Sequence, residues 1–275
     1  MKYLSSSLDC LRCELKLRNI GFRHNQLDEF YRSKWQSEKT CVWFLLYRWL
    51  WFLIFLTIFL LCICNQFADG KYFIFFTNWG IVVCVITQLL AVILATQWHF
   101  NFQDVRSTIS EVSQTLRTPK IVGLYWMLHN VTMVVASVIS FIYWLFLHGK
   151  MDKPIRYPEL TFITHCLNLV FMLVDYFIVA FPVRLMHTIY AMLFTISFFG
   201  FSGIYYLCGG TDDYGHHYVY PFLDWTTPVK CVRAFFGIFF LHCMCSVLLF
   251  GLYQVKRFLH KIYRGDVRRN DDGLI

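Results

Sequence analysis

Charged residues are scarce in this chain: only 15% of its 275 residues are Asp, Glu, Lys or Arg, against roughly 25% in an average soluble domain. Proline and glycine are also few, with 6 and 14 residues, and they cluster at the loops. The shortage of charge argues against a water-soluble fold. The lack of a Pro-rich or Gly-rich tract argues against a linker between domains. We therefore expect a single domain that is not water-soluble.

Long apolar runs fill most of the sequence instead. Hydrophobic residues make up 57% of the chain, and its mean hydropathy is +0.50. Backbone groups inside lipid must find partners within their own segment, so apolar runs of roughly 20 residues form membrane-spanning helices. The sequence thus predicts an all-α fold, a polytopic bundle of six transmembrane helices. The six runs cover about 43–64, 72–96, 121–147, 161–181, 187–207 and 231–254.

Polar tails at residues 1–42 and 255–275 flank this 43–254 transmembrane domain. Most of the 25 Lys and Arg residues lie in these tails and in the 97–120 connection, and an excess of positive charge stays in the cytoplasm. We expect both termini to be cytoplasmic. The formal net charge of +8 is then mainly a property of the cytoplasmic face, so membrane lipid is the expected partner and nucleic acid is not.

One face of the fourth run carries a stripe that includes several polar side chains. Such groups are costly in a membrane unless they face the bundle interior, and spacings of three and four residues place the whole stripe on one side of a helix. The stripe consists of Thr161, His165, Asn168, Met172 and Asp175.

Asp175 and Arg48 of the first run lie at similar depths from the cytoplasmic side. An arginine and a carboxylate at equal depth in neighbouring helices compensate one another. We therefore expect a structural ion pair between them. The alternative is that Arg48 binds the headgroup of a substrate.

Thr77 in the second run and His165 in the fourth lie at matching depth near the exoplasmic side. A hydroxyl beside an imidazole is the minimum for nucleophilic catalysis, because His accepts the Thr proton while the oxygen attacks an ester carbonyl. The alternative is that Thr77 bonds its own helix and His165 packs inside the bundle. No GxSxG, HExxH or P-loop motif accompanies the pair, and the sequence indicates no cofactor.

The last exoplasmic loop, between the fifth and sixth runs, carries further candidate groups. Cys208 and Cys231 bracket this loop, where an oxidising compartment allows a disulfide bridge. A second group is placed to complete the Thr77–His165 site or to bind a metal ion, but we favour solvated loop residues and assign no metal site. This group consists of Asp212, Asp213, His216 and His217.

Three segments connect the chain to a known family. They are LYRW at 46–49, FTNWG at 76–80 and YVYPFLD at 218–224. With them, the whole chain closely resembles the Rolling stone family of insects. This resemblance implies a developmental membrane protein that acts in myoblast fusion during muscle formation.

A weaker similarity links the same residues to the androgen-induced membrane hydrolases. These six-span enzymes cleave fatty acid esters of hydroxy fatty acids with a Thr nucleophile and a His. Thr77 stands in the segment FFTN, where those enzymes have their Thr, and residues 218–224 match their WVYPFLE segment. Thr164 precedes His165, where those enzymes have Asn. The similarity implies that Thr77 and His165 are catalytic residues.

The sequence leaves three functions open. The Rolling stone resemblance favours a role in fusion at the plasma membrane, through cytoplasmic or cell-surface fusion proteins, with the endoplasmic reticulum as the alternative location. The second function is a Thr/His hydrolase of fatty acid esters within the membrane. The third is a transporter or channel, which is favoured least because the spans carry only Arg48, Asp175 and Arg233 as charges.

Overall fold

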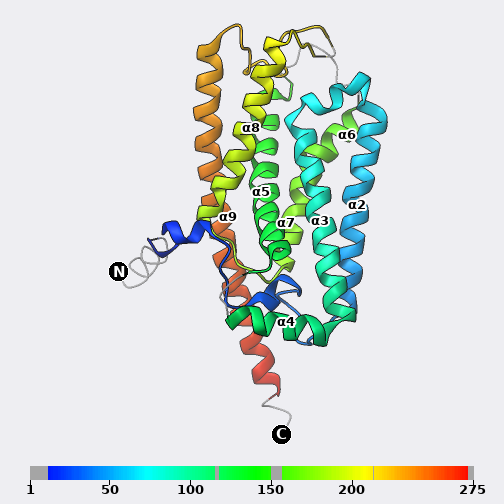
Figure 1. Cartoon of the computed structure of the whole chain (residues 1–275), viewed down its shortest axis with the longest axis vertical. Helices are drawn as coiled ribbons and strands as arrows, with labels where there is room; N and C mark the ends of the chain where they lie inside the picture. The colour runs from blue at the N-terminus through cyan, green and yellow to red at the C-terminus, as the bar shows by residue number, and fades with distance from the viewer. Residues whose placement is uncertain (1–11, 115–117, 150–156, 213, 272–275) are drawn as a thin grey trace.

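The computed structural model describes residues 12–114, 118–149, 157–212 and 214–271. The chain is all-α within these ranges, as the sequence predicts. Six helices are long and apolar enough to cross a membrane, and they lie together as a bundle (Figure 1). Their parts are α2 (Val42–Gln66), α3 (Phe76–Phe100), α5 (Lys120–Ile142) with the π-helical turn η4 (Tyr143–Leu147), α6 (Pro158–Phe162) with the π-helical turn η5 (Ile163–Leu167) and α7 (Asn168–Ile178), η6 (Leu185–His187) with α8 (Thr188–Leu207), and α9 (Pro228–Asp271).

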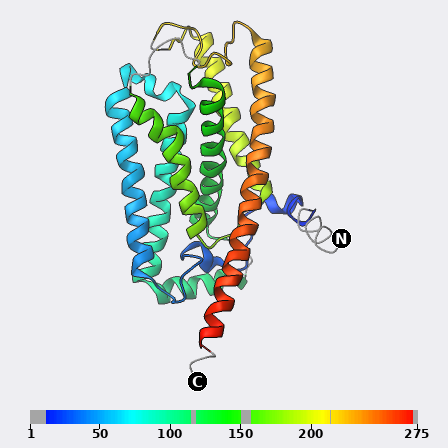
Figure 2. The same ribbon diagram turned by 180° about the vertical axis from the view of Figure 1, so that it is seen from behind.

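Helix α5 runs through the middle of the bundle and is its most buried span (Figures 1 and 2). It contacts α3, α7, α8 and α9. Val134, Val135 and Val138 of this helix belong to the largest core cluster. Helix α2 lies at the edge instead, and its Leu50 and Leu53 are exposed, as expected of a helix that faces lipid.

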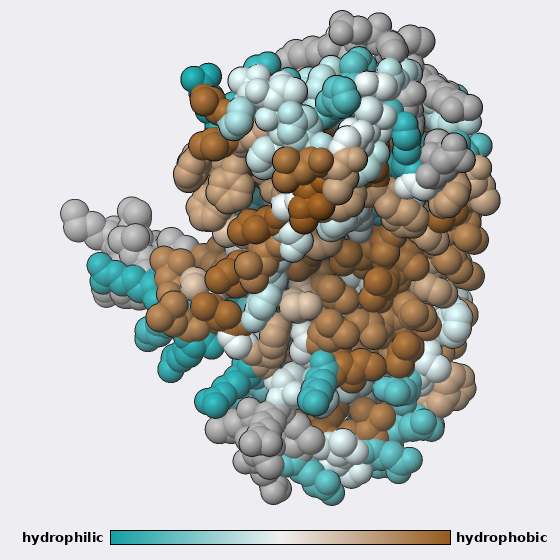
Figure 3. All heavy atoms as spheres, turned by 45° about the horizontal axis from the view of Figure 1, so that its top comes forward, coloured by the Kyte–Doolittle hydropathy of each residue, from teal (hydrophilic) through white to brown (hydrophobic). Residues whose placement is uncertain are grey.

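On the face seen in Figure 3, apolar side chains cover the middle, and hydrophilic ones gather toward the two ends. Helix α4 (Phe102–Gln114) lies across one end (Figure 1). The N-terminal segment reaches the cytoplasmic ends expected for α7 and α9: Trp35 donates a hydrogen bond to the carbonyl oxygen of Phe177 (2.7 Å), and Arg264 donates one to that of Gln36 (3.4 Å). The two end segments of the described chain therefore meet on one side of the bundle.

Several helix boundaries differ from the apolar runs, and three of the differences matter here. The second span begins at Phe76 rather than near 72, because Ala68–Ile74 (η3) forms a 3-10 helix before it. The fourth begins at Pro158, a residue that suits the first turn of a helix because it has no N–H group. The sixth continues past residue 254 to Asp271. The expected tail at 255–275 is therefore largely an extension of the last helix.

Lys256 is fully buried, although the sequence places it in the basic tail. Its Nζ donates hydrogen bonds to the carbonyl oxygens of Tyr176 (2.7 Å) and Val179 (3.0 Å). The last carbonyl groups of a helix have no partner within the helix and carry its negative end. Lys256 therefore caps α7, and its charge is not available to lipid headgroups.

Candidate functional site

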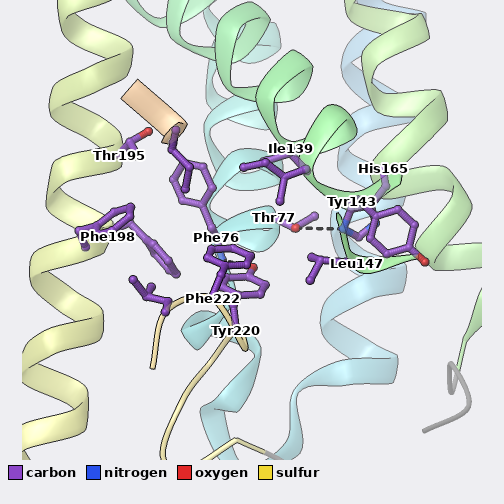
Figure 4. Close-up of a pocket in the computed structure, with 14 residues that line it drawn as sticks. Phe76, Thr77, Ile139, Tyr143, Leu147, His165, Thr195, Phe198, Tyr220 and Phe222 are labelled. Atoms are coloured by element: carbon purple, nitrogen blue, oxygen red, sulfur yellow. Dashed lines mark hydrogen bonds between the residues drawn. The ribbon is translucent and has the colours of Figure 1, made fainter. Parts of the chain in front are cut away.

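Thr77 and His165 meet inside the bundle. Thr77 is the second residue of α3, and His165 lies in the π-helical turn η5. The Thr77 Oγ1 and His165 Nε2 atoms are 3.2 Å apart, and the two side chains point toward one another (Figure 4). The structure thus brings together the two residues that the sequence singles out as a nucleophile and a base.

The local backbone fixes both side chains. Thr77 lies in the first turn of α3, where N–H groups have no partner within the helix and the positive end of the helix dipole is located. His165 lies in a π-helical turn, a form that is frequent at functional sites. Ser140 of α5 donates a hydrogen bond to the His165 carbonyl oxygen (2.5 Å), which ties this turn to the central helix.

The hydrogen-bond partners of His165 set its tautomer. Nδ1 lies 2.9 Å from the carbonyl oxygen of Thr161, which can only accept a hydrogen bond. It also lies 3.0 Å from Thr164 Oγ1, whose hydroxyl donates its own hydrogen to the same carbonyl (3.2 Å). In the neutral ring Nδ1 therefore carries the hydrogen, and Nε2 accepts one from the Thr77 hydroxyl. The ring of Tyr143 lies against the imidazole, with ring centroids 4.0 Å apart (Figure 4). This is the arrangement of a nucleophile, a base and a group that orients the base, with a backbone carbonyl in the third role.

A cavity of about 40 Å³ adjoins the pair. A water molecule needs roughly 10–15 Å³ by this measure, so the space holds a small reacting group and water but not a whole lipid. Its lining is mainly apolar and aromatic, which suits an acyl ester. The lining consists of Phe76, Thr77, Ile139, Ile142, Tyr143, Leu147, His165, Thr195, Phe198, Phe199, Tyr220, Phe222, Leu223 and Ile238.

Tyr220 is a member of this site that sequence reasoning missed. Its hydroxyl oxygen accepts a hydrogen bond from the backbone N–H of Phe76 (3.0 Å). Burial raises the pKa of Tyr220 to about 12, although hydrogen bonds with Phe76 and Thr77 lower it in part. The phenol thus keeps its proton at neutral pH, and its O–H group can donate a hydrogen bond to an oxygen atom in the cavity. The only signal in the sequence was its place within the segment 218–224.

Arg48 and Asp175 lie together, as the sequence predicts from their depths. Arg48 Nη1 donates to Asp175 Oδ1 at 2.6 Å, and the two residues are 2% and 0% exposed. Further hydrogen bonds reach this carboxylate from Tyr47 (2.8 Å) and Gln88 (3.4 Å), and His129 Nε2 lies 3.1 Å from it. The Arg48 guanidinium is engaged in the interior and does not line the cavity, so a headgroup clamp does not fit its position.

The described candidates of the 208–227 loop are not gathered into a site. Cys208 and Cys231 are both free thiols, so the structure does not join them by a disulfide. His216 Nδ1 lies 2.8 Å from Asp212 Oδ2, and both His216 and His217 are exposed. Asp213 lies outside the described residues. Among the residues that are described, no group of three His, Cys, Asp or Glu side chains is placed to hold a metal ion.

Comparisons with known proteins match the chain to one family. A family model described as "Protein rolling stone" matches residues 1–275. The chain is 47% identical over 250 residues to "Protein rolling stone" of Drosophila melanogaster, and the match covers 91% of each chain. No solved structure matches the chain.

Proposed function

The chain belongs to the rolling stone family, and on that premise we propose that it is a multi-pass membrane hydrolase of fatty acid esters. Thr77 is the nucleophile and His165 the general base. One observation carries the proposal: the 3.2 Å contact between Thr77 Oγ1 and His165 Nε2, with Nδ1 held by the Thr161 carbonyl, at the wall of an apolar cavity.

The reaction proceeds by acyl transfer. His165 Nε2 takes the Thr77 proton while Oγ1 attacks the ester carbonyl, which gives a tetrahedral oxyanion. The positive end of α3 and the Tyr220 hydroxyl stabilise the charge on that oxygen. The C–O bond to the alcohol then breaks, and His165 returns the proton to the leaving oxygen. Water, with its proton taken by His165, hydrolyses the acyl–Thr77 ester and regenerates the enzyme.

A fluorophosphonate probe tests this assignment, because it reacts covalently with an activated hydroxyl nucleophile. Membranes that contain wild type, Thr77→Ala or His165→Ala in equal amounts are treated with the probe. We expect labelling of the wild type and a loss of at least about 100-fold in both variants, in line with the contribution of general-base catalysis. Thr87→Ala is the matched control, since Thr87 is a buried residue of α3 whose hydroxyl bonds the Val83 carbonyl of its own helix.

Two results would overturn the assignment. One is an unlabelled wild type that is folded, as judged by a cooperative thermal transition in detergent. The other is equal labelling of Thr77→Ala and Thr87→Ala, which would locate the reactive group elsewhere. Either result leaves Thr77 and His165 as packing residues of the bundle.

A role in myoblast fusion at the plasma membrane is a second proposal, and membership of the rolling stone family supports it. Hydrolysis of membrane esters changes the lipid composition where two cells meet, so the two proposals are compatible. In myoblasts whose own copy is silenced, wild type should restore the number of nuclei per fused cell, and Thr77→Ala should restore few. No rescue by wild type would refute the fusion role. Full rescue by Thr77→Ala would separate that role from hydrolysis.

A further inference from the structure

A second Thr–His pair lies in the bundle, between α8 and α9. Thr195 Oγ1 and His242 Nε2 are 3.0 Å apart, and His242 Nδ1 lies 2.8 Å from the carbonyl oxygen of Ile238. Thr195 is 6% exposed and His242 is 1% exposed. The arrangement repeats that of Thr77 and His165, including the carbonyl four residues before the histidine. A histidine within a membrane span is costly, so a functional partner is the first expectation.

Two hollows meet at this pair. Thr195 and Ile238 line the cavity that also holds Thr77 and His165. The same two residues line a crevice between α8 and α9, together with His242. Ile196 and Phe239 on the rim of the crevice are 44% and 45% exposed, so it opens on the flank of the bundle that faces lipid. Thr195 and Ile238 therefore lie between the lipid-facing crevice and the cavity that holds Thr77.

The local structure distinguishes the second pair from a second nucleophile. Thr195 lies in the middle of α8, where backbone N–H groups already have partners, so no donors remain for an oxyanion. The Ile238 carbonyl fixes the hydrogen on Nδ1 in the neutral ring, and the Thr195 hydrogen is then directed at Nε2. The oxygen of Thr195 is left as an acceptor. The ligand group that fits an acceptor is a donor, and in a neutral lipid that donor is a hydroxyl group.

We infer that the Thr195–His242 pair binds a free hydroxyl group on a lipid ester that enters between α8 and α9. The substrate class is therefore a hydroxyl-bearing ester. This inference rests on the proposed function for the identity of the reacting ester, but not for the binding site itself. Two sources offer the same chemistry, namely a hydroxyl within an acyl chain and a hydroxyl of a glycerol headgroup.

Photocrosslinking with three probes of equal chain length tests the inference. One is a diazirine-bearing fatty acid methyl ester, the second carries an added mid-chain hydroxyl, and the third is the glycerol ester of the first. Full-length protein in phosphatidylcholine vesicles is labelled, and labelled peptides of α8 and α9 are quantified. We expect about threefold to tenfold more labelling by a hydroxyl-bearing probe, the range of one net hydrogen bond. Preference for the second probe identifies a hydroxylated chain, and preference for the third a glycerol headgroup.

Variants assign the preference to Thr195. Thr195→Val should reduce labelling by the favoured probe to that of the plain ester, and Thr195→Ser, which keeps a hydroxyl and shows that the site folds, should retain the preference. Thr188→Val is the matched control on the same helix, since Thr188 is buried and its hydroxyl has no hydrogen-bond partner among the described residues. Equal labelling by all three probes, or an unchanged preference in Thr195→Val, would overturn the inference.

Failure of the proposed function gives a different result. Thr77→Ala should keep the crosslinking preference while losing hydrolysis of the probes. If Thr77→Ala hydrolyses the probes as the wild type does, the catalytic assignment is wrong. The hydroxyl site is then still judged by the Thr195 variants alone.

Discussion

A single hydroxyl group at Tyr220 is placed to serve the oxyanion of the proposed reaction. The N–H of Phe76 bonds the phenol oxygen, and the pKa of about 12 keeps the phenol hydrogen in place. Tyr220→Phe should lower the rate of fluorophosphonate labelling by on the order of 100-fold, the effect of removing one oxyanion donor. The wild-type rate should show no fall from phenol ionisation between pH 7 and pH 9, because that range lies well below the raised pKa.

Tyr205→Phe is the control for this prediction. This substitution also removes a phenol hydrogen bond, which Tyr205 donates to the Thr211 carbonyl oxygen (2.9 Å), but Tyr205 does not line the cavity. Its labelling rate should equal that of the wild type. A Tyr220→Phe protein that is labelled as fast as Tyr205→Phe would remove Tyr220 from the proposed mechanism.

At the residue scale, the sequence predicts the groups that stand out against an apolar background. Thr77 and His165 could be paired because both fall near the same end of their runs. Thr195 and His242 could have been paired by the same argument, since Thr195 lies 12 residues before the end of the 187–207 run and His242 lies 11 residues after the start of the 231–254 run. The role of Tyr220 could not be predicted, because an aromatic residue near a membrane surface is ordinarily interpreted as an interfacial anchor.

At the scale of the helices, one carboxylate joins four of them. Asp175 of α7 is contacted by Arg48 of α2, Gln88 of α3 and His129 of α5. Removal of one member of a buried ion pair leaves a charge without compensation. Arg48→Met and Asp175→Asn should each lower the free energy of unfolding by about 3–5 kcal/mol, measured by denaturant titration in detergent.

A double variant tests whether the pair itself is responsible. Arg48→Met with Asp175→Asn should cost less than the sum of the two single changes, because no charge is then left buried alone. Arg233→Met is the matched control, since Arg233 is an exposed arginine in the last span. Strictly additive costs, or an equal cost for Arg233→Met, would show that the ion pair does not hold these helices together.

Helix number and type follow from hydropathy, whereas the details that build the site do not. The π-helical turns Tyr143–Leu147 and Ile163–Leu167 have no signature in an apolar run, because their register depends on packing against neighbouring helices. The start of α3 at Phe76 has a chemical consequence. It places Thr77 in the first turn of the helix, where the positive end supports an alkoxide or an oxyanion, rather than one turn deeper as the apolar run suggested.

At the scale of the whole molecule, six spans put both ends of the chain on one side of the membrane, but hydropathy alone does not say which side. From the positive charge of the tails and of the 97–120 connection, we predict that this side is cytoplasmic. On that prediction the Thr77–His165 cavity lies in the exoplasmic half of the bundle, and α4 lies at the cytoplasmic surface. Orientation thus decides which leaflet supplies the ester.

Glycosylation mapping tests this orientation, because the modifying enzyme acts only on the exoplasmic side. An Asn-Gly-Thr acceptor inserted beside His217, which is exposed in the 208–227 loop, should be glycosylated, and the same acceptor added to the N-terminus should not. The chain contains its own control: the sequon at Asn130–Thr132 is buried within α5, so wild type should remain unmodified. Modification of the N-terminal acceptor alone would reverse the topology and place the candidate site in the cytoplasmic leaflet.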